Sequence, residues 1–324
     1  MPGVFETYDD LDDVEDKLKA ADAGERRVAI IELSHSGDPG AVAILDGMVA
    51  DPDAGVRQQV AIALGEFDGP GAAAALVRLL VDPEQSVASA AADSMAELKD
   101  PGSADAIFPL VSHSHAFVRM GALRALKELR RKDALKVALD ALRDSDASVR
   151  VQAVGVIGFL KLEEAVPALT SATADTDAHV RRGAINALAF SGTKTAGDAI
   201  VRALADTDWM VRETAAETLG QSKNPVQSAD QLIKALGDEF WQVRLKSTRS
   251  LGIQKVERAV GPITRCLQHE QANLRKEAAA ALGEIADLAA KPALEAVADD
   301  PDPEVRKNAR WALQRIAMVN AGAG

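Results

Sequence analysis

Apolar residues recur along this chain with the period of an α-helix, and the whole arrangement returns about every 31 residues. Its clearest marker is a Val-Arg pair, after which Ala and Leu follow at helical spacing. The Val of this pair is Val56, Val118, Val149, Val180, Val211, Val243 or Val305. Val87-Ala88, Leu274-Arg275 and Glu25-Arg26 fill the same register in weaker form, and one step, from Val211 to Val243, is 32 residues. Ten positions in register indicate an internal repeat.

Each copy of the repeat carries signals for helix ends. An Asp stands five residues before most of the Val positions, as Asp51 does before Val56, and a carboxylate there can accept the free N–H groups of a helix start. Gly65 follows the last Leu of its helix and is expected to be a C-cap. Gly220, Gly252 and Gly283 hold the same place. A second apolar stretch precedes the next Asp, so each copy is predicted to be helix, turn, helix.

One amphipathic helix pair cannot bury its apolar face alone, so the pairs are expected to stack. The Arg of one copy can then reach the Asp of the next and form a ladder of ion pairs. The sequence thus predicts an all-α fold: an α-solenoid (α-α superhelix) of about ten 31-residue two-helix repeats.

We expect three parts along the chain. Residues 1–23 form an N-terminal cap, with a helix over Tyr8–Ala20, residues 24–319 form the repeat solenoid, and residues 320–324 form a flexible tail. The last helix is expected over Lys307–Val319, with Trp311 packing inward. The turn at residues 221–228 holds the one extra residue and Pro225, and it is expected to bend the stack or act as a hinge.

The consensus Asp-x-Asp-x-x-Val-Arg-x-x-Ala-x-x-Ala-Leu-Gly resembles HEAT repeats of the short phycobilisome-lyase type, most closely at residues 175–188 and 206–220. The resemblance extends over about residues 24 to 317. It implies a solenoid whose Val-Arg helices line a concave face. Proteins with such repeats include bilin lyase subunits, assembly chaperones, scaffolds and a hydroxylase. The matched residues are structural, so the resemblance implies no catalytic residue.

Departures from the consensus are where we expect function. On each Val-Arg helix, positions −1, +3, +6 and +10 from the Val form one outward stripe. Position +10 is polar in most copies but apolar at Phe159, Phe190 and Ile253. Because exposed apolar surface with aromatic anchors marks a partner site, we predict a binding groove in copies four to eight. Its residues are Phe117, Met120, Phe159, His179, Phe190, Trp209, Met210, Trp241, Leu245 and Arg249. The alternatives are side chains that fill core gaps between repeats, and a pocket for a small pigment or lipid.

Charge is distributed unevenly along the chain. The net charge is −12, and residues 1–100 hold 7 Lys and Arg against 21 Asp and Glu. Residues 241–324 hold 13 against 10, including a basic stripe near the last three anchors. This stripe is made of Lys246, Arg249, Arg275, Lys276, Lys307 and Arg310. It could meet an acidic patch on a partner or be an ordinary solvated face. The overall acidity makes nucleic acid an unfavourable ligand.

The first 16 residues lack the basic start and apolar core of a signal peptide, and no apolar run approaches the ~20 residues that cross a bilayer. We therefore expect a cytoplasmic protein that does not engage a membrane.

Few residues suggest catalysis or metal binding. Cys266 is the one cysteine, which excludes an internal disulfide and a cluster of thiolate ligands. His113 and His115 replace the Asp pair of the fourth copy, and His269 replaces the Asp of the ninth. No Cys or carboxylate set accompanies them, and no phosphate-binding loop or nucleophile motif is present. We expect no catalytic residue, no metal and no cofactor.

Two functions remain open, besides a nucleic-acid-binding function that the charge opposes. The first is a non-catalytic scaffold, adaptor or assembly factor that grips a partner protein in its concave groove. The second, which the repeat resemblance alone implies, is a bilin (tetrapyrrole) lyase or lyase-like subunit of phycobiliprotein maturation. Its partner would be a pigment-carrying subunit.

Overall fold

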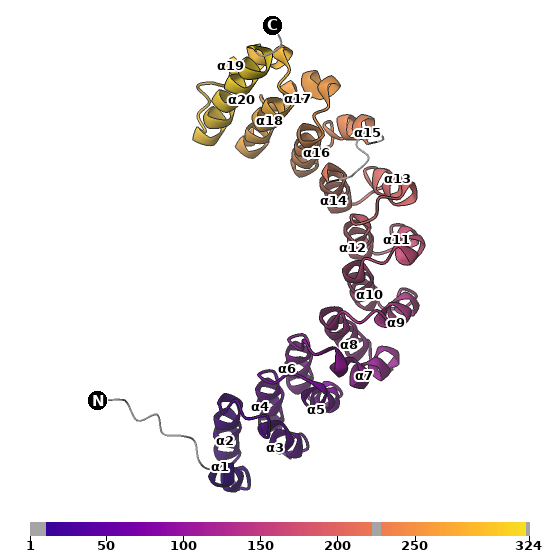
Figure 1. Cartoon of the computed structure of the whole chain (residues 1–324), viewed down its shortest axis with the longest axis vertical. Helices are drawn as coiled ribbons and strands as arrows, with labels where there is room; N and C mark the ends of the chain where they lie inside the picture. The colour runs from indigo at the N-terminus through magenta and orange to yellow at the C-terminus, as the bar shows by residue number, and fades with distance from the viewer. Residues whose placement is uncertain (1–10, 222–227, 322–324) are drawn as a thin grey trace, which may run out of the picture. The chain divides into compact units, whose positions relative to one another are not determined.

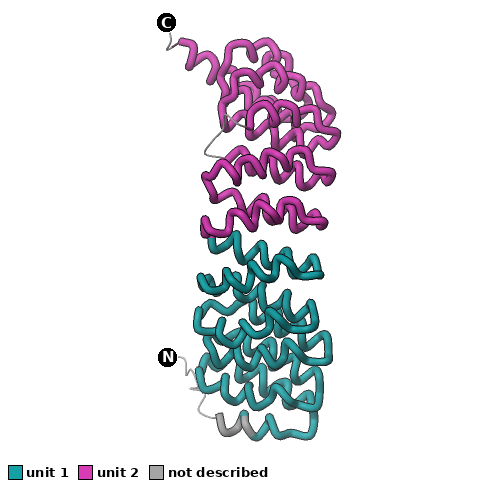
Figure 2. Tube along the Cα trace, turned by 90° about the vertical axis from the view of Figure 1, so that its right-hand side faces the viewer, with its two compact units in different colours: residues 1–160 teal, residues 161–324 magenta. Residues whose placement is uncertain are grey.

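The computed structural model describes residues 11–221 and 228–321. The chain forms two compact units, residues 1–160 (unit 1) and residues 161–324 (unit 2), shown in two colours in Figure 2. Every regular element in the described ranges is helical, which confirms the predicted all-α class. Most of the predicted turn at residues 221–228, including Pro225, and the start of the predicted N-terminal helix lie outside the described residues.

Unit 1 starts with α1 (Leu11–Leu18) and then alternates between two rows of helices (Figure 1). The first helices of the repeats are α2 (Ala23–His35), α4 (Ala54–Leu64), α6 (Gln85–Met95), α8 (Ala116–Leu129) and α10 (Ala147–Leu160). The second helices are α3 (Ala41–Gly47), α5 (Pro70–Leu80), α7 (Ala104–Ile107) and α9 (Ala134–Ala141). Successive first helices contact each other, and each second helix contacts the first helix of the next repeat. This arrangement is the predicted stack of helix pairs.

Unit 2 has the same two rows. Its first helices are α12 (Ala178–Leu188), α14 (Trp209–Gly220), α16 (Trp241–Ile253), α18 (Ala272–Ile285) and α20 (Pro303–Ala321). The second helices are α11 (Val166–Ala172), α13 (Lys194–Ala203), α15 (Ala229–Ala235), α17 (Val260–Cys266) and α19 (Lys291–Glu295). We call the two sets of first helices the first-helix rows. Within the described residues no second helix follows α20.

The C-terminal boundary differs from the prediction. Asn320 and Ala321 were expected in a flexible tail, but they belong to α20, and the Asn320 amide donates to the Ile316 carbonyl at 2.8 Å. Trp311 was predicted to pack inward, and it does so only in part. Its ring lies against Gly283 of α18, yet 38% of the residue is exposed.

The consensus apolar residues form the core of both units. The anchor Val residues are buried, with Val56 and Val180 fully so, and the Leu residues that follow, such as Leu64 and Leu188, are fully buried as well. Burying each such side chain contributes roughly 1.5–3 kcal/mol. The repeated pattern is therefore explained by packing between helices.

The predicted ladder is present as two-point ion pairs. Arg57 donates from Nε and Nη2 to the two carboxylate oxygens of Asp82, at 2.6 and 3.0 Å. Equivalent pairs are Arg26–Asp51, Arg119–Asp144, Arg181–Asp206, Arg212–Asp238 and Arg275–Asp300. Their side chains are only 4–14% exposed. Each pair, which we call a rung, therefore joins one repeat to the next where little solvent reaches it.

The helix N-cap is a different Asp from the one predicted. The Asp51 carboxylate accepts the N–H of Asp53, before the helix starts, and faces Arg26 of the preceding repeat. Asp53 is the N-cap, because its carboxylate accepts the N–H of Val56. Asp177, Asp208 and Asp302 act in the same way. The prediction that the Asp five residues before Val caps the helix was wrong, since that Asp serves the ladder.

The Gly that recurs in the repeat is a C-cap only at Gly65, which is the C-cap of α4 as predicted and has a right-handed conformation with φ −67°. Gly252 lies inside α16, so the C-cap prediction was wrong there. A Cβ on Gly252 would lie 2.7 Å from the Cα of Ala281 in α18. Gly220 is equally close to Ser250, and Gly283 to Trp311. These glycines permit close approach of successive first helices.

Candidate functional site

The first-helix row of unit 1 exposes apolar side chains at its start. Val28 and Ile31 in α2 are 53% and 40% exposed, and Ile62 in α4 is 47% exposed. Val28, Ile31 and Gln59 line a hollow of 860 Å³, with Lys17, Asp22, Glu25 and Arg27 also lining it. We call Val28, Ile31 and Ile62 the α2/α4 patch.

Sequence reasoning missed this patch, although its signal was present. Val28 and Ile31 stand at positions +3 and +6 from Glu25, and Ile62 stands at +6 from Val56. These are stripe positions, where most other copies carry polar or small residues such as Gln152 and Asn186. The prediction was instead based mainly on apolar residues close to the Val, such as Phe117 at −1, and at position +10, such as Phe159. These occur in later copies of the repeat.

Three of the predicted groove residues lie in unit 1. Phe159 in α10 is 37% exposed, and the Arg130 guanidinium lies over its ring at 4.8 Å from the centroid. Phe117 and Met120 in α8 are half-buried. Phe117 also lines a hollow of 390 Å³ near the loop before α8, and Phe159 is not among the residues that line it.

The other seven lie in unit 2. Trp209 stacks on Phe240, with ring centroids 5.2 Å apart and an interplanar angle of 11°. Phe240 was not predicted, although it holds the position where Asp caps the helix in other copies. Met210 accepts a contact from Arg182, from Nη1 to sulfur at 3.8 Å. Phe190, Trp241 and Leu245 are half-buried, and His179 is exposed at the start of α12.

Arg249, the last predicted residue, is already engaged within the chain. It donates to both carboxylate oxygens of Glu277, at 3.0 and 2.8 Å, and this carboxylate raises the pKa of Arg249. Lys246 similarly donates to Glu217 at 2.6 Å. Arg275 was expected in an exposed basic stripe, but it forms a ladder rung with Asp300. In the predicted stripe, Lys246, Arg249 and Arg275 are therefore paired with carboxylates of the same chain.

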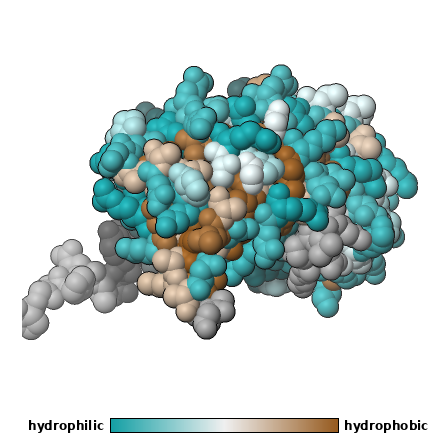
Figure 3. Space-filling model, turned by 90° about the horizontal axis from the view of Figure 1, so that it is seen from above, coloured by the Kyte–Doolittle hydropathy of each residue, from teal (hydrophilic) through white to brown (hydrophobic). Residues whose placement is uncertain are grey.

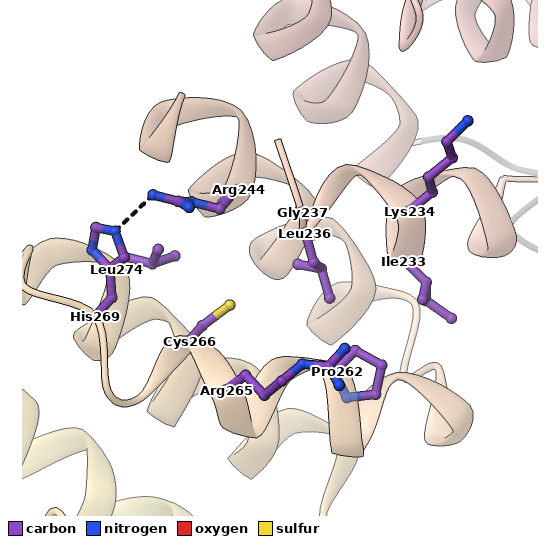
Figure 4. Close-up of a pocket in the computed structure, with 10 residues that line it drawn as sticks. All are labelled: Ile233, Lys234, Leu236, Gly237, Arg244, Pro262, Arg265, Cys266, His269 and Leu274. Atoms are coloured by element: carbon purple, nitrogen blue, oxygen red, sulfur yellow. Dashed lines mark hydrogen bonds between the residues drawn. The ribbon is translucent and has the colours of Figure 1, made fainter. Parts of the chain in front are cut away.

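The ladder is incomplete at two places, and each borders a hollow. Residue 88, where an Arg is expected, is Ala88, and its partner position 25 residues later is His113. Both line a hollow of 390 Å³ in unit 1. In unit 2, Arg244 is present but the partner position is His269, and both line a hollow of 320 Å³ (Figure 4).

Two side chains that line the unit 2 hollow, His269 and Cys266, have pKa values shifted from their ordinary ranges. Burial, followed by the charge of Arg244, lowers the pKa of His269. Burial raises the pKa of the Cys266 thiol, which also lines this hollow. The Cys266 side chain is therefore held as a neutral thiol at neutral pH.

Other chemistry in the described residues is sparse. The rings of His113 and His115 lie 5.5 Å apart, and no group of three or more His, Cys, Asp or Glu in residues 11–221 and 228–321 is placed to hold a metal ion. Over the same ranges, no helix is both long enough and apolar enough to cross a bilayer. The view in Figure 3 shows apolar residues enclosed by hydrophilic ones on the face that it presents.

The sequence matches the family model for HEAT repeats over residues 11–95, 78–149, 135–220 and 229–314. The chain belongs to the HEAT-repeat family. The match is to HEAT repeats in general, and the phycobilisome-lyase type stays a prediction. None of the curated proteins matches this HEAT-repeat chain significantly.

Solved structures share the HEAT-repeat fold at low sequence identity. An engineered protein is 21% identical, with a TM-score of 0.51, and the match covers 94% of this chain and 98% of that one. YibA of Escherichia coli is 19% identical, with a TM-score of 0.61, over 75% of this chain and 91% of that one. Kap95p, in a structure with RanGDP, is 13% identical, with a TM-score of 0.62, over 94% of this chain and 50% of that one. These similarities show the fold.

Proposed function

We propose that this HEAT-repeat protein is a non-catalytic scaffold or adaptor that holds a partner protein along its first-helix rows. The observation that carries the proposal is the exposure of Val28, Ile31 and Ile62 on one row beside an 860 Å³ hollow. The consensus apolar residues are buried, so these three side chains are not needed for stacking. Clustered exposed apolar side chains favour contact with a partner.

The charge around this patch favours a particular partner chemistry. The first 100 residues carry 21 acidic against 7 basic side chains, whereas the hollow itself is lined by two acidic residues, Asp22 and Glu25, and two basic ones, Lys17 and Arg27. A segment with apolar anchors flanked by Lys or Arg would bury the patch and meet complementary charge. Kap95p, which has this fold, binds RanGDP, a protein, and this precedent agrees with the proposal.

The residues predicted from the sequence remain part of the proposed surface, except Arg249, whose guanidinium is bound by Glu277. Phe159 would extend the α2/α4 patch along the row of unit 1. The Trp209–Phe240 stack would provide a second anchor point in unit 2, because aromatic side chains commonly dominate interface energy.

Affinity capture with matched variants tests the proposal. Ile31→Glu/Ile62→Glu places charges on the α2/α4 patch, while Leu288→Glu places one on a residue that is 58% exposed just before α19, outside the first helices. We expect one stoichiometric protein to be retained by the wild type and by Leu288→Glu, and lost by the double variant. Equal retention by all three proteins would refute this surface, and recovery of a pigment in place of a protein would favour the lyase function.

A further inference from the structure

The interrupted rung of unit 2 differs from every complete rung in how its Arg is bonded. In the complete rungs, Nε and Nη2 both donate to carboxylate oxygens, as Arg212 does to Asp238 at 2.7 and 3.0 Å. Arg244 has His269 in place of that carboxylate, with Nη2 at 2.6 Å from the ring Nε2. Its buried Nε has no hydrogen-bond partner among the described residues. Arg244 therefore keeps its charge without a carboxylate of its own.

The two ring nitrogens of His269 each face an N–H donor, and a neutral imidazole can accept a hydrogen bond at only one of them. The Gln271 N–H donates to His269 Nδ1 at 3.0 Å, which takes the place of the N–H bond that Asp accepts in other copies. A neutral imidazole that accepts at Nδ1 carries its proton on Nε2. That Nε2–H then faces the Nη2–H of Arg244, donor against donor. The tautomer with its proton on Nδ1 would instead place two donors against each other at Gln271. A protonated ring would place a donor against a donor at both nitrogens.

An acceptor between the two side chains would remove this conflict, and the adjoining hollow offers room for one. The hollow has a volume of 320 Å³, and its ten lining residues include Lys234, Arg265, Arg244 and His269 but no Asp or Glu (Figure 4). The nearby Asp238 has both oxygens bonded to Arg212. The electrostatics of the hollow thus favour an anion.

We propose that this hollow binds a small oxyanion, a phosphate or a carboxylate, between Arg244 and His269. One oxygen accepts from Nε and another from Nη2 of Arg244, as the Asp oxygens do in a complete rung, and the Nε2–H of His269 supplies a third donor. Charge-assisted bonds of this kind are strong where solvent is limited. The site contains no residue of the α2/α4 patch. Its residues lie in the second helices α15 and α17 and the loops, and in the first helices α16 and α18.

The interrupted rung of unit 1 provides an internal contrast. His113 likewise accepts a backbone N–H at Nδ1, from His115 at 3.2 Å. The facing position is Ala88, so no guanidinium is left there in need of an acceptor. The proposed oxyanion site therefore requires an Arg, here Arg244, whose partner Asp is replaced by His. Replacement of the Asp by His without the Arg, as at His113, does not create such a site.

Calorimetric titration of the full chain tests the proposal with inorganic phosphate and with glutarate as probes, at constant ionic strength. His269→Asp restores a complete rung and should weaken binding at least about tenfold, because the new carboxylate occupies Arg244. His113→Asp is the matched control and should bind as the wild type does. Binding of phosphate alone would identify a phosphate site, and binding of glutarate as well would identify a general carboxylate site. No binding of either probe, or equal binding by His269→Asp, would overturn the proposal.

Discussion

The guanidinium of Arg57 binds both carboxylate oxygens of Asp82, 25 residues later, and at the same time donates from Nη1 to the carbonyl of Asp51 in its own loop at 2.8 Å. Asp82 in turn accepts the N–H of Glu84 at 2.9 Å. One side chain thus fixes the loop of its own repeat to the loop of the next. Because the pair is directional and largely buried, it specifies the register in which successive repeats stack.

Breaking one rung should destabilise unit 2. In Arg181→Met the Asp206 carboxylate stays largely buried and loses its partner, so the free energy of unfolding should fall by about 1–3 kcal/mol. Urea denaturation followed by circular dichroism measures the change. The double variant Arg181→Met/Asp206→Leu should recover part of the loss, since no charge is then left unpaired. A single variant as stable as the wild type would show that the rung adds nothing to stability.

Completing the absent rung of unit 1 should stabilise it. Ala88→Arg/His113→Asp introduces both partners, and the 390 Å³ hollow beside them provides room for the longer side chain. We expect the free energy of unfolding of the double variant to exceed the value given by adding the effects of the two single variants by about 1 kcal/mol. This difference is the coupling energy of two residues in direct contact. Thermal denaturation of the four proteins gives this coupling energy. A coupling energy of zero would contradict the geometry of the ladder.

The close approach of α16 and α18 should make Gly252 intolerant of a side chain. Gly252→Ala places a Cβ 2.7 Å from the backbone of Ala281, and the two helices must move apart at a cost of about 1–3 kcal/mol. Gly197→Ala is the control, because Gly197 lies in α13 with no atom within 4 Å of its added Cβ. That variant should gain up to about 1 kcal/mol from helix propensity. Chemical denaturation distinguishes the two, and equal effects would refute the packing argument.

Acid should weaken the ladder. Hydrogen bonds from Arg57, Arg119 and Arg275 lower the pKa of Asp82, Asp144 and Asp300, respectively. These carboxylates bind fewer protons in the folded than in the unfolded chain, where their pKa is about 3.9. Their contribution is therefore complete above that value and is lost as the pH falls through the lowered folded pKa.

Urea midpoints between pH 7 and pH 3 test this dependence in the wild type and in Arg119→Met. We expect the wild type to lose stability below about pH 4.5, and the variant to lose less over the same interval, because Asp144 has then lost the largest cause of its lowered pKa. If the urea midpoints of the two proteins fell equally with pH, Arg119 would not be the cause of the lowered pKa of Asp144.

The repeat architecture could be predicted because its determinants are local and recur ten times. The Val-Arg spacing identified the helix pairs, and the Arg–Asp ladder followed from the length of the repeat. Helix ends were harder to predict. Asp51 and Asp53 are both plausible N-caps in a sequence, and only the position of Arg26 in the preceding repeat shows which of them is used by the ladder. Gly252 similarly required knowledge of where Ala281 lies.

The candidate site could be predicted only in part. Trp209 was identified as an aromatic departure, but its partner Phe240 occupies a position expected to carry an N-cap. Arg249 was expected to be available, yet Glu277 stands 28 residues later on the adjacent first helix and binds it. Contacts between repeats decide whether a side chain is available, and a single sequence does not show them.

Hydrogen–deuterium exchange on the captured complex tests the proposed binding surface most directly. The account predicts that the partner slows exchange in peptides of α2 and α4, which carry Val28, Ile31 and Ile62, and leaves the second helices α3 and α5 unchanged. Protection confined to α3 and α5, with none in α2 and α4, would contradict binding along the first-helix row.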